Sequence, residues 1–251
     1  MALTDLRGHV PQPGELAGRV IAITGATDGI GRAVALAAAA AGAEILLLGR
    51  NLRKLKAVFG DIEAAHGQVV SMVPLDLEKA LAGDFDRIAA AIDDRYGRLD
   101  GLVHCAGILG SMTPVEHYDV PTWCRVLHVN LTAAFALTQV LLPLLRKSAD
   151  GSIVFTSSSV GRRGRAYWGA YAVSKAGVEG LTQVLAAELE GNSSVRVNAL
   201  NPGRARTLMR RQAFPSEDLD SLPLPETLTG PYIALLGPAG AGITGQSLDA
   251  Q

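Results

Sequence analysis

A strand, a glycine-rich turn, a helix and a second strand follow one another near the start of the chain. Residues 19–24 (Arg-Val-Ile-Ala-Ile-Thr) form a short apolar run that predicts a buried strand. An Ala/Leu-rich stretch then continues to Ala41 and predicts a helix that Gly42 ends. Residues 44–48 (Glu-Ile-Leu-Leu-Leu) predict the second strand. A βαβ unit of this kind requires parallel strands joined by a right-handed crossover, so we expect the chain to fold around a parallel sheet.

The rest of the chain continues this alternation. Further strands are predicted at residues 69–75, 99–104, 153–156, 195–200 and 243–248. Helices are predicted at residues 51–66, 85–96, 122–145, 171–190 and 232–236. We therefore expect residues 1–251 to form one α/β domain, a doubly wound parallel seven-stranded sheet with helices on both faces (Rossmann fold). Residues 1–18 are interpreted as an N-terminal arm, and residues 204–228 as a long substrate loop or lid.

The charge balance and the cysteines limit the classes of partner. The sequence has 23 basic and 24 acidic residues without a basic stripe or an acidic tail, so neither nucleic acid nor a membrane surface is expected as a partner. No run reaches about 18 consecutive apolar residues, and residues 1–18 lack the form of a signal peptide. Cys105 and Cys124 fit neither a disulfide scaffold nor a metal site. We expect a cytoplasmic protein without a bound metal.

The glycine turn at residues 25–31 (Gly-Ala-Thr-Asp-Gly-Ile-Gly) is the first functional signal. Glycines let a backbone turn tightly and approach a pyrophosphate, and a helix amino end offers free N–H groups to it. The spacing is G-x-x-x-G-x-G rather than the common G-x-G-x-x-G. Although any βα turn can collect glycines, three within seven residues favour nucleotide binding. The candidate cofactor-binding residues of this turn are Gly25, Thr27, Asp28, Gly29, Ile30 and Gly31.

The residues after the next strands bear on which nucleotide is bound. Gly49 stands where NAD-binding proteins place a carboxylate for the ribose, and Arg50 follows it, which favours the 2′-phosphate of NADP(H). A solvated arginine is the alternative, and NAD(H) stays possible. Asp76 could accept a hydrogen bond from adenine or could cap the following helix. Small residues at 105–107 would let a nicotinamide-ribose pass close to the backbone. The further candidate cofactor-binding residues are Arg50, Asn51, Asp76, Leu77, Cys105, Ala106 and Gly107.

Tyr171 and Lys175 stand four residues apart, so a helix places them on one face about one turn apart. An ammonium beside a phenol favours the phenolate, and we expect it to lower the tyrosine pKa toward neutral pH. The pair alone is a weak signal, because such residues are usually surface side chains. Ser158 could hydrogen-bond the oxygen whose proton moves. Asn130 lies within an apolar helix, where it faces outward, bonds back to its helix, or faces the cleft and holds a water beside Lys175.

Together these motifs resemble the short-chain dehydrogenase/reductase family, over residues 16–249 and in the expected order. Residues 24–31 match the family's cofactor loop. The family's catalytic tetrad is matched by Asn130, Ser158, Tyr171 and Lys175. The segment that contacts the nicotinamide carboxamide is matched by Asn201, Pro202, Gly203 and Thr207. The run at residues 156–162 and the ending Leu-Asp-Ala-Gln at 248–251 look like the YciK-like subgroup of oxidoreductases.

The resemblance implies an NADP(H)-dependent carbonyl reductase or alcohol dehydrogenase acting on a small-molecule substrate. It implies that Tyr171 gives or takes the hydroxyl proton while hydride passes to or from the nicotinamide. Lys175 would lower the tyrosine pKa and hold the ribose hydroxyls, so both residues also belong to the cofactor site. Ser158 would polarise the substrate oxygen, and Asn130 would hold a relay water. The family's enoyl reductases space tyrosine and lysine more widely, which disfavours double-bond reduction.

One departure from the family pattern leaves an alternative open. The family usually has Asn-Asn-Ala-Gly where this chain has His104-Cys105-Ala106-Gly107, so the amides that tie this turn are missing. The alternative is an NADP(H)-binding regulatory or scaffold protein of the same fold with little or no turnover. The resemblance also implies a homodimer or homotetramer that pairs through the helices carrying Asn130 and Tyr171. The small residues that would permit this pairing are Ala133, Ala134, Ala136, Ala172, Ala176, Gly177 and Gly180.

Overall fold

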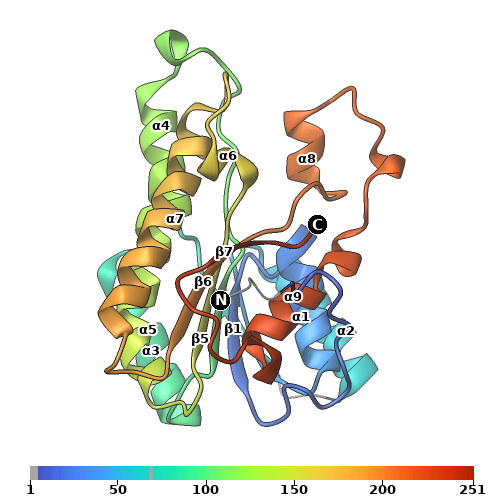
Figure 1. Ribbon diagram of the computed structural model, residues 1–251, viewed down its shortest axis with the longest axis vertical. Helices are drawn as coiled ribbons and strands as arrows, with labels where there is room; N and C mark the ends of the chain where they lie inside the picture. Colours follow the sequence, from blue (N-terminus) through green and yellow to red (C-terminus); the bar gives the residue numbers. More distant parts are fainter. Residues whose placement is uncertain (1–4, 68–69) are drawn as a thin grey trace.

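A parallel sheet of seven strands, in the order β3-β2-β1-β4-β5-β6-β7, forms the centre of the molecule (Figure 1). The structure, a computed structural model, describes residues 5–67 and 70–251. Residues 1–4 of the predicted arm and Val69 of the predicted third strand lie outside the described residues. The strands are β1 (Val20–Thr24), β2 (Glu44–Gly49), β3 (Val70–Pro74), β4 (Gly101–His104), β5 (Ser152–Thr156), β6 (Arg196–Asn201) and β7 (Ser247–Asp249). The predicted doubly wound fold is confirmed.

Helices cover both faces of the sheet. The α-helices are α1 (Gly29–Ala40), α2 (Leu52–His66), α3 (Ala82–Tyr96), α4 (Val120–Leu127), α5 (Ala133–Arg146), α6 (Ser159–Arg162), α7 (Gly169–Leu189), α8 (Leu208–Ala213) and α9 (Gly230–Leu236). Helices α1, α2 and α9 lie on one face, and α3, α5 and α7 lie on the other (Figure 1). Each face has its own apolar core, with Leu47 and Tyr232 in the first and Leu137 and Phe155 in the second. The strands are apolar throughout because both faces are buried.

The order of the strands places a crevice at one edge of the sheet. Strand β1 lies between β2 and β4, and Thr24 at its end is paired with Leu48 on one side and His104 on the other. From β1 the chain runs outward to β3 and then returns to β4 and runs outward the other way. The loops after β1 and β4 therefore separate, and a crevice opens between them at the carboxyl ends of the strands. Ligands of open α/β sheets bind at such a switch point.

The predicted helix at residues 122–145 is a continuous helical segment from Val120 to Arg146. A π-helical turn, His128–Thr132, interrupts it between α4 and α5. By length and composition alone this segment could cross a membrane, a test that the core helices of soluble proteins also pass. In this fold 44% of its most apolar window is buried.

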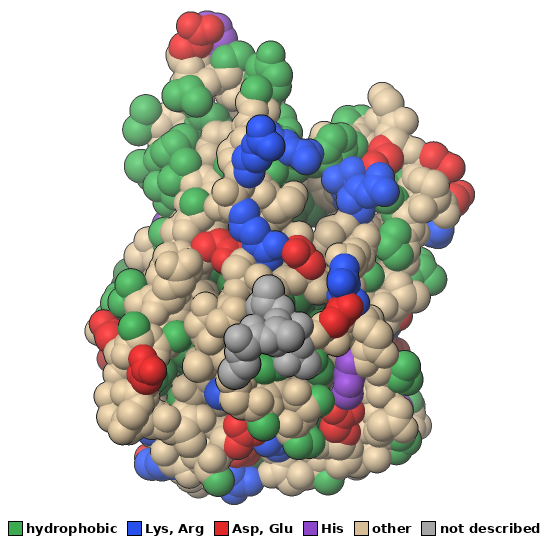
Figure 2. All heavy atoms as spheres, viewed as in Figure 1, with side chains coloured by type: hydrophobic (Ala, Val, Ile, Leu, Met, Phe, Trp, Pro, Cys, Tyr) green, Lys and Arg blue, Asp and Glu red, His purple; other side chains and the backbone are tan. Residues whose placement is uncertain are grey.

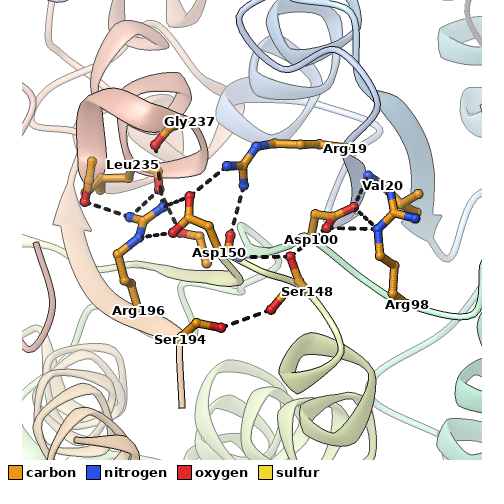
Figure 3. Close-up of polar contacts among 12 residues, drawn as sticks. Arg19, Val20, Arg98, Asp100, Ser148, Asp150, Ser194, Arg196, Leu235 and Gly237 are labelled. Carbon is orange, nitrogen blue, oxygen red and sulfur yellow. Dashed lines mark hydrogen bonds and ion pairs between the residues drawn. The ribbon is translucent and has the colours of Figure 1, made fainter. Parts of the chain in front are cut away.

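A polar network joins the amino ends of the central strands, at the edge of the sheet opposite the crevice (Figure 3). Arg196, at the start of β6, is buried and donates from Nε to Asp150 Oδ1 over 2.7 Å. Arg19 donates from Nη2 to the other oxygen of Asp150 over 2.6 Å. The Asp100 carboxylate accepts the backbone N–H of Val20 over 2.9 Å. These contacts join the segments that precede β1, β4, β5 and β6, so the amino ends of the central strands are fixed far from the crevice.

Two predicted segments differ in the structure. The last strand was expected at residues 243–248, but β7 covers only Ser247–Asp249. Gly242 and Gly245 adopt φ values of 74° and 68°, which turn the backbone out of the extended conformation before the strand begins. The loop at residues 204–228 contains α8 and two 3₁₀ turns, Leu219–Ser221 and Pro225–Leu228.

The small-residue faces predicted for pairing are partly used inside the fold. Ala133, Ala134 and Ala172 are buried within the chain. A Cβ on Gly177 would lie 2.5 Å from a methyl group of Leu131, so that glycine packs against the π turn of the same chain. Of the predicted residues on α7, Ala176 and Gly180 are exposed, so the pairing face stays a prediction there.

Candidate active site

The glycine turn passes between the ends of β1 and β4 and leaves no space for a side chain at Gly25 or Gly31. A Cβ on Gly25 would lie 2.8 Å from the backbone of Ala106, and Gly25 adopts φ 66°. A Cβ on Gly31 would lie 2.3 Å from the carbonyl oxygen of Gly25. Asp28 ends the turn by accepting the Gly29 N–H over 2.9 Å at the start of α1. The turn therefore presents backbone and the amino end of α1 to the crevice, which suits an anionic pyrophosphate.

The crevice holds a cavity of about 1080 Å³. It opens between the part of the molecule that carries α4 and α7 and the part that carries α8, with basic side chains beside the hollow (Figure 2). The predicted site residues that line the cavity are Gly25, Thr27, Asp28, Gly29, Ile30, Gly31, Arg50, Asn51, Asp76, Leu77, Cys105, Ala106, Gly107, Ser158, Tyr171, Lys175, Pro202, Gly203 and Thr207. Among the predicted site residues, Asn130 alone does not line it. The cavity and its glycine cradle fit a dinucleotide.

One end of the cavity carries two basic side chains. Arg50 follows β2, as predicted, and Lys54 on α2 lines the same wall. The Lys54 ammonium pairs with the Asp28 carboxylate over 2.5 Å, and Asn51 caps α2 by accepting the Lys54 N–H over 3.0 Å. Lys54 was not predicted as a site residue. The Asp28 side chain is about half exposed and does not require a cation, so no sequence signal pointed to Lys54.

Asp76 and Leu77 form the neighbouring wall after β3. The Asp76 Oδ1 accepts the backbone N–H of Glu78 over 3.2 Å, so its carboxylate holds the turn while it borders the cavity. This turn precedes α3, which starts only at Ala82, so Asp76 does not cap that helix.

Three of the four tetrad residues meet at the other end of the cavity. Tyr171 and Lys175 lie on one face of α7, as their spacing predicted, and Ser158 is the N-cap residue just before α6. The Lys175 ammonium is buried, donates to the Thr156 carbonyl oxygen over 2.6 Å, and lies 5.6 Å from the centre of the Tyr171 ring. A phenol, a hydroxyl and an ammonium therefore converge on one wall.

The pKa of Tyr171 is higher than the sequence predicted. Burial of the phenol raises this pKa to about 12, and a hydrogen bond with Ser158 only partly opposes the rise. The expected lowering by Lys175 is therefore wrong for the free protein, because exclusion of water from a phenolate outweighs the distant ammonium. Burial also lowers the pKa of Lys175, to about 8.

Asn130 lies behind the cavity wall and faces inward from the π turn. Its side chain is 3% exposed; Oδ1 accepts the Ile108 N–H over 2.8 Å, and Nδ2 donates to the Ile108 carbonyl over 2.9 Å and to Ser174 Oγ over 3.1 Å. A Cβ on Gly107 would lie 3.4 Å from that Oδ1. Both N–H groups of the amide are engaged and Oδ1 accepts one bond, so the side chain supports the Ile108 loop, and its role in holding a relay water stays a prediction.

His104 and Cys105 form new ties where the family has asparagines. The His104 imidazole bonds Thr138 on α5 over 2.9 Å and stacks on Phe155, and burial lowers its pKa to about 3. Cys105 Sγ bonds Thr156 over 3.2 Å, and burial raises its pKa to about 11. The turn is thus linked to α5 and β5. Within residues 5–67 and 70–251, no group of three or more His, Cys, Asp or Glu side chains could hold a metal ion.

The remaining wall includes α8 from the predicted lid and combines apolar with polar side chains. Met209 and Ala213 on α8 pack with Trp168, next to Leu109 and Tyr171. Apolar side chains therefore surround Tyr171 at this wall, while Arg210 and Gln212 of α8 line the same cavity.

Comparisons with known proteins agree with this geometry. The family model described as short chain dehydrogenase matches residues 19–218. The oxidoreductase YciK of Escherichia coli K12, described as uncharacterized, is 46% identical over 243 residues, which cover 97% of this chain and 96% of YciK. Two solved structures described as short chain dehydrogenases cover 96% of this chain and 100% of theirs. The one from Shigella flexneri 2a strain 301, complexed with NADP, is 45% identical with a TM-score of 0.93. The one from Escherichia coli CFT073, complexed with NADPH, is 47% identical with a TM-score of 0.93. The chain belongs to the short-chain dehydrogenase family.

Proposed function

We propose that this protein is an NADP(H)-dependent oxidoreductase that transfers hydride between the nicotinamide and a carbonyl or alcohol carbon of a small substrate. The single observation that carries the proposal is that the glycine cradle and the Ser158, Tyr171 and Lys175 side chains share one cavity. The two relatives solved with NADP and NADPH, at 45% and 47% identity, support the cofactor. Bound cofactor supplies the hydride, and the residues of this chain supply position and a proton.

Tyr171 is the proton donor in the direction of carbonyl reduction. Its raised pKa of about 12 keeps the phenol protonated in the free protein, and a neutral phenol is the form that can donate. Ser158 hydrogen-bonds the same substrate oxygen and orients it. Lys175, held toward the site by the Thr156 carbonyl, stabilises negative charge on the phenol oxygen as the proton leaves. Asn130 acts as a positioning residue through its bonds to Ile108.

Arg50 and Lys54 select NADP(H) over NAD(H). Both cations line the cavity beyond the glycine turn, and Gly49 leaves that position without a carboxylate. A 2′-phosphate would gain two charge-assisted contacts there, whereas a ribose hydroxyl would gain only neutral ones.

The test is Tyr171→Phe, compared with Tyr167→Phe as a matched control. Tyr167 is an exposed tyrosine nearby that does not line the cavity. With a panel of aldehydes, ketones and secondary alcohols, we expect Tyr171→Phe to lose at least about 100-fold in turnover and to keep its affinity for NADPH. Turnover close to the wild-type rate in this variant would remove Tyr171 from the mechanism.

The alternative is an NADP(H)-binding regulatory or scaffold protein, and it depended on the altered turn at His104 and Cys105. The bonds of these residues to Thr138 and Thr156 replace ties that the missing amides would have made, so the turn no longer favours that alternative. Wild-type protein that binds NADPH tightly but converts no member of the panel would restore it.

For the whole protein we propose a homo-oligomer in the cytoplasm. Three large apolar side chains are exposed on α5 and α7: Phe135, Val173 and Val184. Val173 and Val184 are eleven residues apart, about three helical turns, so they stand on one face of α7. Exposed apolar side chains that share a face favour a protein contact. The predicted and exposed Ala176 and Gly180 lie between these two valines on the same face of α7.

A further inference from the structure

The wall segment after β6 is held from outside the cavity by Gln251. Its Nε2 donates to the carbonyl oxygens of Pro202 and Arg204, over 2.7 Å in both cases. Gly203 lies between them with φ 76°, and a Cβ there would lie 2.6 Å from the Gln251 side chain. Pro202 and Gly203 line the cavity, whereas Gln251 does not. One amide therefore spans both ends of the turn from behind.

Asp249 holds the start of the same segment. Its Oδ1 accepts the Asn201 Nδ2 over 2.8 Å, and Asn201 Oδ1 in turn accepts the Gly203 N–H over 3.1 Å. The Ala250 N–H also donates to the Asn201 carbonyl over 2.9 Å. Because β7 pairs with β6 over only three residues, these bonds supplement a short ladder.

Arg162 connects Asp249 to α6, the helix that follows Ser158. Its Nη1 donates to Asp249 Oδ2 over 2.7 Å and its Nη2 donates to the Leu248 carbonyl over 2.6 Å. Arg162 ends α6, a helix of one turn whose first flanking residue is Ser158. A continuous set of polar contacts therefore runs from the Ser158 helix through β7 to the Pro202–Gly203 wall.

We propose that Gln251, with Asp249 and Arg162 behind it, is a positioning residue for the nicotinamide half of the cofactor. This inference rests on the proposed NADP(H) binding. The bonds of Gln251 reach only backbone carbonyls that are open to solvent. Those carbonyls can bond water when the amide is removed, so the fold keeps most of its stability while the wall loses its fixed position.

The experiment compares Gln251→Met with Gln246→Met, because methionine keeps the length of the side chain and removes its donors. Gln246 is exposed, and its side chain bonds only the Thr244 carbonyl, away from the cavity. Affinities are measured for NADPH and for 2′,5′-ADP, a fragment with the adenosine 2′-phosphate and without the nicotinamide. Urea unfolding without ligand is measured for each variant.

We expect Gln251→Met to bind NADPH about 5- to 20-fold more weakly and to bind 2′,5′-ADP as the wild type does. Asp249→Ala should show the same split, and Gln246→Met should show neither change. If Gln251→Met binds both ligands equally more weakly, or neither more weakly, the inference is overturned. The proposed function would still stand in that case, provided that the wild type binds NADPH. A wild type that binds neither ligand would overturn both.

Discussion

The Lys175 ammonium is buried within the cavity wall, and its charge lowers the free energy of unfolding. Burial lowers its pKa from 10.5 to about 8, although nearby Cys105 and Glu179 act to raise it. The folded chain therefore binds this proton more weakly than the unfolded chain. Between about pH 8 and pH 10.5 the unfolded state holds the extra proton, so this group makes the free energy of unfolding rise with pH in that window. The free energy of unfolding is therefore lower at neutral pH because this charge is buried in the cavity wall.

Lys175→Met should therefore stabilise the cofactor-free protein while it abolishes activity. At neutral pH we expect the free energy of unfolding to rise by about 1–3 kcal/mol, because the desolvated charge is removed. Urea unfolding at neutral pH and near pH 9.5 measures this difference from the wild type, and the difference should be smaller at the higher pH. The exposed Lys147→Met is the control. A variant less stable than the wild type at neutral pH would mean that the bond to Thr156 outweighs the burial cost.

Lys54→Gln should change the affinity for NADPH and not the affinity for NADH. The loss of one cation beside the predicted phosphate position should weaken NADPH binding about 10-fold and leave NADH binding unchanged. Arg53→Gln is the matched control, since Arg53 is an exposed cation next to Lys54 that does not line the cavity. Titration of all three proteins with both cofactors measures the difference. Equal losses for NADPH and NADH would assign Lys54 to the turn alone, through its pair with Asp28.

At the level of elements, the π turn between α4 and α5 determines how Asn130 is used. The turn lies within a helix whose other inward residues are apolar except for Thr138, and it directs one amide toward the Gly107–Ile108 loop. Both backbone groups of Ile108 are bonded by that amide. The helix thus supports the loop that borders the cavity, rather than reaching into the cavity itself.

Asn130→Ala should destabilise the fold as well as the site. The substitution leaves the Ile108 N–H and carbonyl without their partner, which should lower the free energy of unfolding by about 2–4 kcal/mol. Asn192→Ala is the control, because that exposed side chain bonds only the Glu188 carbonyl. Urea unfolding of both variants gives the comparison. A loss below about 0.5 kcal/mol would show that water or another donor replaces the amide.

The strands and their order along the chain could be predicted because strands buried on both faces are continuous apolar runs. The runs at residues 19–24 and 44–48 correspond to β1 and β2 within one residue. The residues that line the crevice could be predicted from the glycine turn and from the spacing of the tetrad. The last strand could not be predicted in place, since the positive φ of Gly245 is a tertiary feature.

Two features of the site have no local sequence signal. A π turn adds one residue to an apolar helix without disturbing its composition, so the inward direction of Asn130 could not be predicted. The pKa of Tyr171 depends on how many elements bury the phenol, and a four-residue spacing to Lys175 contains no such information. Lys54 was missed for a similar reason, because its contact with Asp28 crosses 26 residues of chain.

At the scale of the whole molecule, the cavity and the polar network lie at opposite ends of the strands. The cavity lies at the carboxyl ends of the strands, and the network of Arg19, Asp150 and Arg196 lies at their amino ends (Figure 3). Loops at the cavity can therefore vary without loosening the frame. The outer faces of α5 and α7 remain available to a second copy.

Val184→Glu should dissociate the proposed oligomer. Val184 is 54% exposed on α7, and a carboxylate placed within an apolar contact would be left without a partner. Light scattering coupled to size-exclusion chromatography measures the mass, which should fall to that of one chain. Val115→Glu is the control, since Val115 is 73% exposed in a 3₁₀ turn away from α5 and α7. A Val184→Glu protein with the wild-type mass would exclude this face.

The environments of the two cysteines have a practical consequence. Cys105 is tied to Thr156, and its raised pKa keeps it a thiol, the form that reacts poorly with alkylating reagents. Cys124 is exposed on α4, whose neighbouring residues Thr122 and Arg125 line the cavity opposite α8. A fluorescent maleimide should therefore label Cys124 first, with no engineered mutation. Its emission would then report in real time when a ligand occupies the cleft.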